Sequence, residues 1–567
     1  MKGRDLALGK RIAGVFAVVT LLVQAHAAAK PGADSLHALQ DLRLRLDKLY
    51  TSQPYRTSAV SAKVVSLRTG EVLYERNADK PLTPASTTKL FSTATLYALR
   101  GGGADLVTDV RTEGSVDASG ILNGDLVLVG CGDALLAVTD IDRLAEQIER
   151  LGIKKITGGI YGDGFVFDND VHRSSYSGDN EDVEPLPPIT ALSLQRGTIA
   201  ITASASRSGQ VILNMQPASD GIELVNAVKV SAARSRSRTA TRATRAPVRS
   251  TPRKKVARSL RRSRGRAEVL TPDYERMAEH VGDAPRLRSG RSSRRRVIRS
   301  IARISASSSL VAGGIQRIVV SGRISPGTST TVYASCSKPA LVAAGVLRQR
   351  LRGRGITVLG SIGERAHTPK SASIASVRRP LVELASIVNK KSDNFLAEHV
   401  FKMCGAAAGA RPSSARSSTQ CVVGVLDSLQ VPRLGCVLND GSGLSRRNQT
   451  SASTQVALLQ RIASQPWADE YKATLAVAGA DGTIRKRLIG THAANNVFAK
   501  TGTLRNVSAL SGYVTTRDGE PLAFALISNG NSVSSYKYTE DMAALVLASF
   551  SRMGVSTAAS AGEIKAK

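Results

Sequence analysis

The chain has 567 residues, enough for three or four domains, and 42% of them are hydrophobic and 22% charged. These are ordinary values for globular proteins, so a chain that is disordered throughout is excluded. No apolar run reaches the length that a membrane-spanning helix needs, which excludes a membrane span in the body of the chain. The formal net charge is +33, and its distribution along the chain is more informative than its size.

Residues 1–27 have the organisation of a signal peptide. Basic residues precede an apolar stretch at 12–23, and Ala25 and Ala27 then supply the small-x-small pattern that signal peptidase accepts. We therefore predict export, with cleavage after Ala27 and no transmembrane segment in the mature chain. An uncleaved membrane anchor is the alternative that the same pattern allows.

The segments near the two ends of the chain alternate between helix and strand patterns. Near the N-terminus we expect an amphipathic helix at 34–50, a hairpin around 68–70 and a helix that begins close to Ser86 and ends at glycines 101–103. Near the C-terminus, three successive strands and a helix are expected at 497–504, 508–516, 520–528 and 539–553. This pattern favours one α/β domain whose halves are separated by a long insertion.

The middle of the chain differs in kind from its ends. From about 105 to 230, and again after 315, short apolar runs alternate with turn residues, which indicates β-rich subdomains. Between these parts, residues 234–303 contain 23 lysines and arginines against five acidic residues, more than half of the chain's excess charge. Few apolar side chains and many repelling arginines predict a largely disordered surface loop.

Two hypotheses address the role of this basic segment. We interpret it as a solvated insertion without a partner, and the alternative is attraction to an anionic polymer of the cell envelope. Nucleic acid is not an expected partner, because the chain carries a signal peptide and the arginines have no aromatic stacking platform beside them.

The cysteines and histidines indicate no metal site. Of the five cysteines, Cys404, Cys421 and Cys436 lie close enough in sequence for one local disulfide, and small buried hydrophobic residues are an equally good interpretation. The seven histidines are scattered without metal-ligand spacing, so we predict no metal and no cofactor.

Three short motifs carry the chemistry: Ser86-Thr87-Thr88-Lys89, Ser392-Asp393-Asn394 and Lys500-Thr501-Gly502. A Ser-x-x-Lys motif alone is weak, and the chain repeats it at Ser335 and Ser534. The copy at Ser86 opens an expected helix, where residues i and i+3 share one face, so the amine of Lys89 can serve as the base for the hydroxyl. The second motif can cap the helix that follows it, and the third ends an expected strand.

On these motifs, the chain resembles the D-alanyl-D-alanine carboxypeptidase/endopeptidase family of class C low-molecular-mass penicillin-binding proteins, the DacB-type serine peptidases. The segments at 81–91, 126–133, 191–197, 390–401, 439–452 and 498–504 also resemble family segments. The resemblance implies an α/β penicillin-recognising domain of the transpeptidase and β-lactamase type, interrupted by two nested, mostly β domains. It places the catalytic domain at 34–104 and 370–557, an inserted β-rich domain at 105–190 and 335–369, and an inner β domain at 191–334.

The resemblance also implies a role for each motif residue. Ser86 would attack the carbonyl between two D-alanines of a peptidoglycan stem peptide, and Lys89 would take its proton. Ser392, Asn394 and Lys500 would complete the catalytic group, and Thr501, Gly502 and Thr503 would bind the substrate's terminal carboxylate. The backbone amides of Ser86 and Thr503 would form the oxyanion hole. The enzyme would work in the periplasm, soluble or loosely membrane-associated, and β-lactam antibiotics such as penicillin would inhibit it.

Two rival functions and one question of specificity stay open. A serine β-lactamase shares the three motifs, but no Glu-x-x-x-Asn element stands between Asn394 and Lys500, where Glu398 and Glu470 are the available glutamates. A non-catalytic protein that binds an envelope polymer is the second rival. The sequence does not decide whether the enzyme is a carboxypeptidase alone or also a D,D-endopeptidase.

Overall fold

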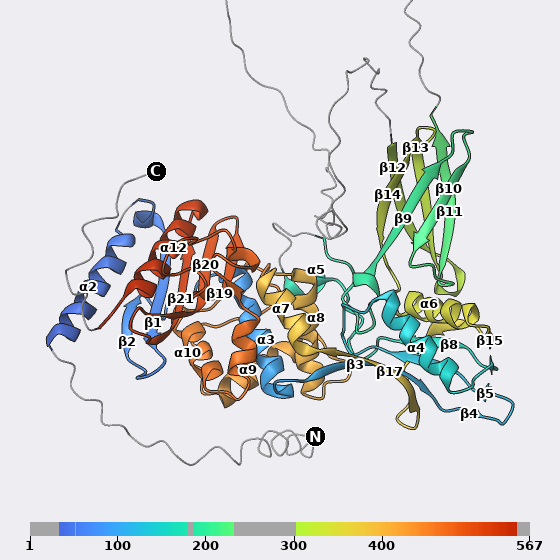
Figure 1. The fold of residues 1–567 in the computed structure, drawn as a ribbon, viewed down its shortest axis with the longest axis horizontal. Helices are drawn as coiled ribbons and strands as arrows, with labels where there is room; N and C mark the ends of the chain where they lie inside the picture. Colours follow the sequence, from blue (N-terminus) through green and yellow to red (C-terminus); the bar gives the residue numbers. More distant parts are fainter. Residues whose placement is uncertain (1–32, 52, 179–184, 232–301, 553–567) are drawn as a thin grey trace, which may run out of the picture.

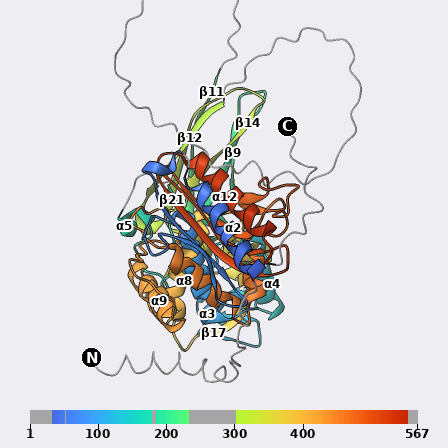
Figure 2. The ribbon, with the colours of Figure 1, turned by 90° about the vertical axis from the view of Figure 1, so that its left-hand side faces the viewer.

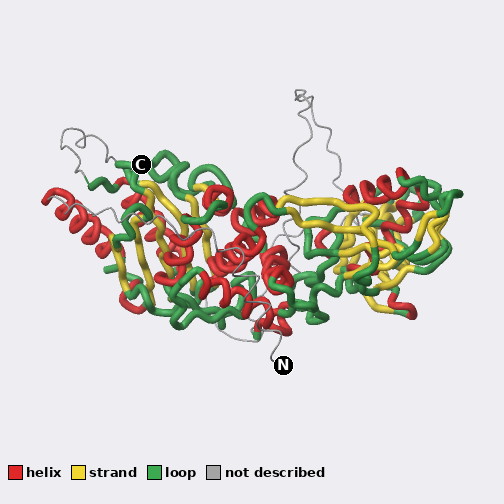
Figure 3. The backbone as a smooth tube through the Cα atoms, turned by 90° about the horizontal axis from the view of Figure 1, so that it is seen from below, coloured by secondary structure: helices red, strands yellow, loops and turns green. Residues whose placement is uncertain are grey.

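The computed structural model describes residues 33–51, 53–178, 185–231 and 302–552. The molecule is elongated, with the two ends of the chain forming one end and the middle of the chain forming the other (Figures 1 and 3). The expected signal peptide at 1–27 lies outside the described residues, as does the basic segment except for its last two residues, Ala302 and Arg303. In the described part of the chain, no helix has both the length and the apolarity to cross a membrane.

A six-stranded sheet joins the N-terminal and C-terminal parts of the chain. Its strand order is β18 (Ala476–Val477), β19 (Phe498–Leu504), β20 (Val507–Thr515), β21 (Pro521–Asn529), β1 (Ala59–Ser66) and β2 (Val72–Arg76). The expected hairpin near 68–70 and the three expected C-terminal strands are therefore confirmed. Strand β1 pairs with β21 along its whole length, from Ala59–Asn529 to Ser66–Leu522, which closes the split domain.

Helices cover both faces of this sheet. On one face lie α2 (Ala33–Leu49) and α12 (Val533–Ser549), which pack against each other (Figure 2). They contribute Leu42, Leu46 and Tyr536 to a buried core. The opposite face carries α3 (Lys89–Arg100), α8 (Asn394–Ala407), α9 (Ala415–Ser428) and α10 (Ala452–Ala463). This second, larger core positions the helices that carry the first two motifs.

The C-terminal helix begins six residues before the expected start at 539. Its buried positions include Tyr536, Glu540 and Ala543, which continue the helical spacing back through a polar segment. Apolar periodicity alone missed this first part because serines and lysine occupy its exposed face. The expected helices at 34–50 and after Ser86 are confirmed as α2 and α3.

The inserted segment begins with two small mixed sheets. One has the order β16 (Ile362–Glu364), β8 (Ile160–Asp163), β6 (Leu126–Val129), β3 (Asp105–Thr112) and β17 (Ala372–Pro380). The other has the order β15 (Thr357–Val358), β7 (Lys155–Ile156), β5 (Ile121–Asn123) and β4 (Ser115–Val116). They pack with α4 (Val138–Arg150) and α6 (Pro339–Gly353) around one apolar core. Because β17 pairs with β3, we propose that the boundary of the catalytic domain lies after Pro380 rather than at 370.

Two three-stranded sheets form the distal end of the molecule, which we call the distal module. One has the order β10 (Val211–Gln216), β9 (Thr198–Ala205) and β14 (Ser329–Ser335), and the other has the order β11 (Ile222–Val230), β13 (Gln316–Ile324) and β12 (Ala302–Leu310). Its core includes Ile201 and Ile318. The basic segment leaves from β11 and returns at β12, and Val230 and Ala302 both pair with Ile324. Val230 and Ala302, on the two sides of the undescribed residues, therefore lie at the same tip of the sheet.

All five cysteines are free thiols in the structure. Cys404 is buried in α8, and its Sγ lies 3.3 Å from the carbonyl oxygen of Ser92 and 3.2 Å from that of Val400. This cysteine therefore matches the interpretation as a small buried hydrophobic residue rather than the disulfide alternative.

Candidate active site

Ser86 and Lys89 lie where a short 3-10 turn, η2 (Ala85–Thr88), runs into α3. The turn and the helix place the serine hydroxyl beside the lysine amine, and 2.8 Å separates Ser86 Oγ from Lys89 Nζ. Lys89 is completely buried, whereas Ser86 is partly exposed. The i, i+3 spacing thus brings the two side chains together as expected. The difference is that Ser86 precedes the α-helix instead of lying within it.

The copy of Ser-x-x-Lys at Ser335 lacks this arrangement. Ser335 ends β14 in the distal module, and Lys338 forms an ion pair with Glu364 at 2.9 Å. The structural setting, not the four-residue pattern, therefore distinguishes Ser86 from this copy.

Two further acceptors hold the amine of Lys89. Its Nζ donates to Oδ1 of Asn394 at 2.9 Å and to the backbone carbonyl of Ser442, which also accepts from Ser86 Oγ at 3.3 Å. Asn394 begins α8, and the Asp393 side chain caps this helix by accepting from the amide of Leu396 at 2.9 Å. The expected capping by the second motif is confirmed, and the cap fixes the direction of the Asn394 side chain.

Ser392 connects the second motif to the third. It has a positive φ of 60°, a conformation that is uncommon for residues other than glycine, and its Oγ accepts from Lys500 Nζ at 2.8 Å. Lys500 lies on β19 and is completely buried. Strain of this kind is found where surrounding contacts hold a side chain for function.

The Lys-Thr-Gly strand approaches the serine turn closely. A Cβ on Gly502 would lie 2.5 Å from the carbonyl oxygen of Pro84, so only glycine allows β19 to come this near to η2. Thr501 is half-buried and donates to Thr483 Oγ1 at 2.9 Å, and Thr503 is exposed. Strand β18 pairs with β19 only at Phe498 and Ala499. The outer edge of β19 from Lys500 onward therefore has no strand partner among the described residues.

Burial controls the protonation of both lysines. Desolvation lowers the pKa of Lys89 to about 8, although the carboxylates of Asp440, Glu398 and Asp393 oppose this shift. Desolvation also lowers the pKa of Lys500 well below its usual value, and the charge of Lys89 lowers it further. Because two buried ammonium groups repel each other, the two lysines are not both charged near neutral pH. The Lys89 amine becomes available as a base as the pH rises toward about 8 and above.

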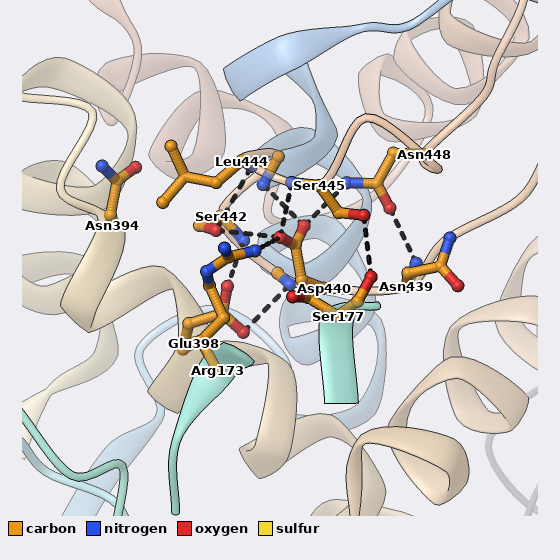
Figure 4. Close-up of polar contacts among 12 residues, drawn as sticks. Arg173, Ser177, Asn394, Glu398, Asn439, Asp440, Ser442, Leu444, Ser445 and Asn448 are labelled. Carbon is orange, nitrogen blue, oxygen red and sulfur yellow. Dashed lines mark hydrogen bonds and ion pairs between the residues drawn. The ribbon is translucent and has the colours of Figure 1, made fainter. Parts of the chain in front are cut away.

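The loop at 440–445 joins the site, although the sequence pattern indicates no catalytic role for it beyond its place in a family-like segment at 439–452. The loop contributes the backbone carbonyl of Ser442, which accepts from Lys89 and Ser86. The next residue, Gly443, has a φ of +79°, and a Cβ at this position would collide with the carbonyl oxygen of Ala85. Figure 4 shows the side chains behind this loop. A turn signal is present in the sequence, since two glycines flank Ser442 between Asp440 and Ser445, but it does not reveal which element the turn contacts.

Neither glutamate between the second and third motifs is placed to activate a water molecule. Glu398 is completely buried, and its oxygens accept from the amides of Ser442 at 2.8 Å and Gly441 at 3.2 Å. Glu470 lies at the far end of α3 and accepts from the Tyr97 hydroxyl and the Gly103 amide, both at 2.9 Å. These contacts disfavour the rapid deacylation that a β-lactamase of this type needs.

The structure therefore brings five of the sequence-predicted residues together in two hydrogen-bonded sets, one of Ser86, Lys89 and Asn394 and one of Ser392 and Lys500. The two sets are close enough for the charge of Lys89 to lower the pKa of Lys500. A hydroxyl beside a buried amine of lowered pKa is the arrangement of an activated nucleophile, which suits acyl transfer. Thr501, Gly502 and Thr503 line the neighbouring strand edge, where a substrate backbone can be accommodated.

Comparisons with known proteins agree with this chemistry. The model of the D-Ala-D-Ala carboxypeptidase 3 (S13) family matches residues 42–253 and 281–550. A D-alanyl-D-alanine carboxypeptidase of Actinomadura sp. strain R39 is 30% identical over 558 residues, which cover 96% of this chain and 91% of that protein.

Solved structures show the same fold. The crystal structure of penicillin-binding protein 4 (dacB) of Haemophilus influenzae covers 87% of this chain and 93% of its own, with a TM-score of 0.59 and 22% identity. A second structure of that protein, complexed with a novel β-lactam, has a TM-score of 0.56 and 21% identity over the same shares of the two chains.

Proposed function

This chain belongs to the D-Ala-D-Ala carboxypeptidase 3 (S13) family, and we propose that it removes the terminal D-alanine of peptidoglycan stem peptides through an acyl-enzyme on Ser86. The observation that carries the proposal is the contact between Ser86 Oγ and the fully buried amine of Lys89, at 2.8 Å. A serine hydroxyl is a weak nucleophile until a neighbouring base takes its proton, and a desolvated lysine provides such a base.

The surroundings of Lys89 suit a neutral amine. A neutral amine has two N–H donors and one lone pair; the Ser442 carbonyl and Asn394 Oδ1 accept the two donors. The lone pair is then directed at the Ser86 hydroxyl. In acylation, the Ser86 proton moves to Lys89 Nζ while Ser86 Oγ forms a bond to the carbonyl carbon.

The leaving group needs a proton when the peptide bond breaks. Ser392, held by Lys500 at 2.8 Å, is our candidate for the group that passes a proton to the departing D-alanine amine. Water then attacks the ester, the acid portion is released, and the proton returns to Ser86. The proton that Lys89 took from Ser86 replaces the one that Ser392 gives up, and a proton of the attacking water restores Ser86, so the enzyme regains its protons over the complete cycle.

The unpaired edge of β19 is our candidate for the substrate-binding surface. An extended peptide can add to such an edge through its backbone, with the terminal carboxylate near Thr501 and Thr503. The backbone amides of Ser86 and Thr503 would donate to the developing oxyanion, and loss of one such donor typically costs about 10²–10³-fold in rate. The structure of penicillin-binding protein 4 of Haemophilus influenzae in complex with a β-lactam supports β-lactams as inhibitors of the same site in this chain.

The test of this function is the release of D-alanine from a peptide that ends in D-Ala-D-Ala. Ser86→Ala should abolish release, and Ser335→Ala should leave it unchanged, because Ser335 belongs to a Ser-x-x-Lys copy in the distal module. Release that survives Ser86→Ala would overturn the mechanism. A cross-linked peptide dimer tested in parallel decides whether the enzyme also has D,D-endopeptidase activity.

The compartment is a separate part of the proposal. Peptidoglycan lies outside the cytoplasm, and the pattern at residues 1–27 supports export to the periplasm. N-terminal sequencing of the exported protein should begin at Ala28. A start at the first residues of the chain would support an uncleaved anchor instead.

A further inference from the structure

A short helix of the inserted segment contacts the back of the catalytic loop. Helix α5 (Arg173–Ser177) places Arg173 against Asp440 of the loop, with 2.8 Å between Arg173 Nη1 and Asp440 Oδ2 (Figure 4). Both side chains are almost fully buried, 2% and 0% exposed. The Ser177 carbonyl also accepts from Ser445 Oγ at 2.9 Å. The inserted segment and the catalytic domain are thus joined directly behind the site.

Asp440 accepts hydrogen bonds from every side of the loop. Besides Arg173, it accepts from the amide of Gly443 at 2.9 Å, the amide of Ser445 at 2.8 Å and Nδ2 of Asn448 at 2.7 Å. A carboxylate that is buried and bonded in this way holds the loop in one conformation, because any other would leave a buried charge or amide unpaired.

The contact with Gly443 determines where the Ser442 carbonyl points. The carbonyl of Ser442 and the N–H of Gly443 belong to one planar, trans peptide, so the two groups point in opposite directions. With the N–H directed at Asp440, the carbonyl is directed away from it, at Lys89 Nζ and Ser86 Oγ. The position of the Asp440 carboxylate thereby determines how the Ser442 carbonyl contacts Lys89 and Ser86.

A second carboxylate, that of Glu398, binds the backbone amides that precede Gly443 in the same loop. Glu398 accepts from the amides of Gly441 and Ser442, and the Tyr176 hydroxyl from α5 donates to it at 3.0 Å. The inserted helix therefore contacts both carboxylates that hold the loop. The two contacts are made by Arg173 and Tyr176, which lie three residues apart on the short helix α5.

We propose that Asp440, held by Arg173 of the inserted segment, is a positioning residue that orients the Ser442 carbonyl and thereby fixes the Lys89 amine for proton transfer from Ser86. This inference rests on the proposed function, because it assigns Lys89 the role of base. It makes the inserted segment part of the catalytic centre rather than an appended module. The alternative is that the buried ion pair contributes to stability alone.

The pH profile of acylation separates these two roles. The negative charge of Asp440 raises the pKa of Lys89, so Asp440→Asn should move the acidic limb of the profile to lower pH. A merely structural loss would lower the rate at every pH and leave the limb in place. Other charged or titratable groups surround the lysine: Glu398 and Lys402 of α8, Asp393 with its partner Arg196, Lys500 of β19, and Arg173 and Tyr176 of α5.

Glu398 does not reverse this expectation. Burial and the charge of Asp440 raise its pKa to about 7, so removing the Asp440 charge makes Glu398 ionise at lower pH. Near pH 8, where Lys89 titrates, Glu398 is already mostly ionised, and its effect on Lys89 changes little.

The experiment measures acylation by a fluorescent penicillin in the wild type, Asp440→Asn, Arg173→Met and Arg173→Lys. We expect acylation to slow by about 10²-fold in Asp440→Asn, the size of effect that follows from a misplaced catalytic group, with the affinity for the penicillin nearly unchanged. Arg173→Lys keeps the charge and should recover part of the rate that Arg173→Met loses. The matched control is Asp133→Asn, another buried aspartate paired with an arginine, Arg379, away from the site. It should acylate at the wild-type rate.

Failure of this inference and failure of the proposed function give different results. If the wild type is not acylated at Ser86, the proposed function is wrong. If the wild type is acylated, and Asp440→Asn melts cooperatively but acylates at the wild-type rate with an unmoved acidic limb, the positioning role is wrong. If Asp440→Asn does not fold, Arg173→Met replaces it, and acylation at the wild-type rate in that variant would overturn the proposal equally.

Discussion

The catalytic end and the distal module are stabilised in different ways. Around Ser86, the residues that matter are polar, and Lys89, Lys500, Glu398 and Asp440 are all buried. In the distal module, side chains alternate between the two faces of each strand, and a small apolar core that includes Ile201 and Ile318 lies between the sheets. Buried charges are costly unless each has a partner, whereas an apolar core needs only shape and volume.

This difference has a consequence for mutations. A substitution at the catalytic end changes chemistry through charge and hydrogen bonding, while a substitution in the distal module should change stability alone. The expectations below test that contrast, and they run from the largest effect on catalysis to the smallest.

Removal of the base gives the largest effect within this series. Lys89→Met keeps the length of the side chain and removes the amine, so Ser86 loses the group that takes its proton. Acylation by benzylpenicillin should slow by about 10²–10⁴-fold, the usual contribution of a positioned base. The matched control is Lys338→Met, in the second Ser-x-x-Lys copy, which should acylate normally. Normal acylation in Lys89→Met would assign the base to another residue.

The pH dependence of the wild type gives the next effect. Burial lowers the pKa of Lys89 to about 8, so the amine is neutral and active above this pH and protonated and inactive below it. The rate constant for acylation should therefore rise with pH and level off above about 8, with a loss of about tenfold per pH unit below it. A stopped-flow series with a penicillin substrate measures this. A profile that is flat down to pH 6 would contradict the assignment of Lys89.

A smaller effect is expected at the rim of the site. Arg196, in the inserted segment, pairs with Asp393 at 2.6 Å, and the two side chains are 26% and 18% exposed. Because a partly exposed pair contributes roughly 0–1 kcal/mol, Arg196→Met should lower the rate of D-alanine release by at most about fivefold. The control is Arg317→Met, which breaks the more exposed pair with Glu223 in the distal module. A loss as large as that of Lys89→Met would place Arg196 in the chemistry itself.

Substitutions in the distal module are expected to have no effect on catalysis. Ile201→Ala removes a fully buried side chain from the core of the module and should destabilise it by about 2–5 kcal/mol, with kcat unchanged. Ile212→Ala, at a position that is 60% exposed on the neighbouring strand, should change neither quantity. Hydrogen exchange of the module and D-alanine release measure the two outcomes. A fall in kcat with Ile201→Ala would mean that the module and the site are coupled.

Local patterns allowed much of the catalytic core to be predicted. Ser86 and Lys89 share one face because their spacing matches the start of a helix, and Asp393 caps α8 because its side chain can accept from an amide three residues later. Alternating and helical patterns also located β19, β20, β21 and most of α12. These features depend on residues that are close in sequence.

The rest of the site depends on contacts between distant parts of the chain. Ser442 contributes a backbone carbonyl, which no residue type reveals, and its direction depends on Asp440. Asp440 is itself paired with Arg173, 267 positions earlier in the chain. The pairing of β17 with β3 is another long-range contact. It places in the inserted sheet a strand that the family resemblance assigns to the catalytic domain.

The central claim, that Ser86 is a nucleophile activated by a buried lysine, is tested most directly by mass spectrometry. The intact protein is incubated briefly with benzylpenicillin, weighed and then mapped by peptide digestion. The account predicts one stable penicilloyl adduct, on the peptide that contains Ser86, because the described structure places no glutamate where it could activate a deacylating water. An adduct on a different peptide, or no adduct with the penicillin left intact, would contradict the claim. Absence of an adduct together with hydrolysed penicillin would instead identify a β-lactamase.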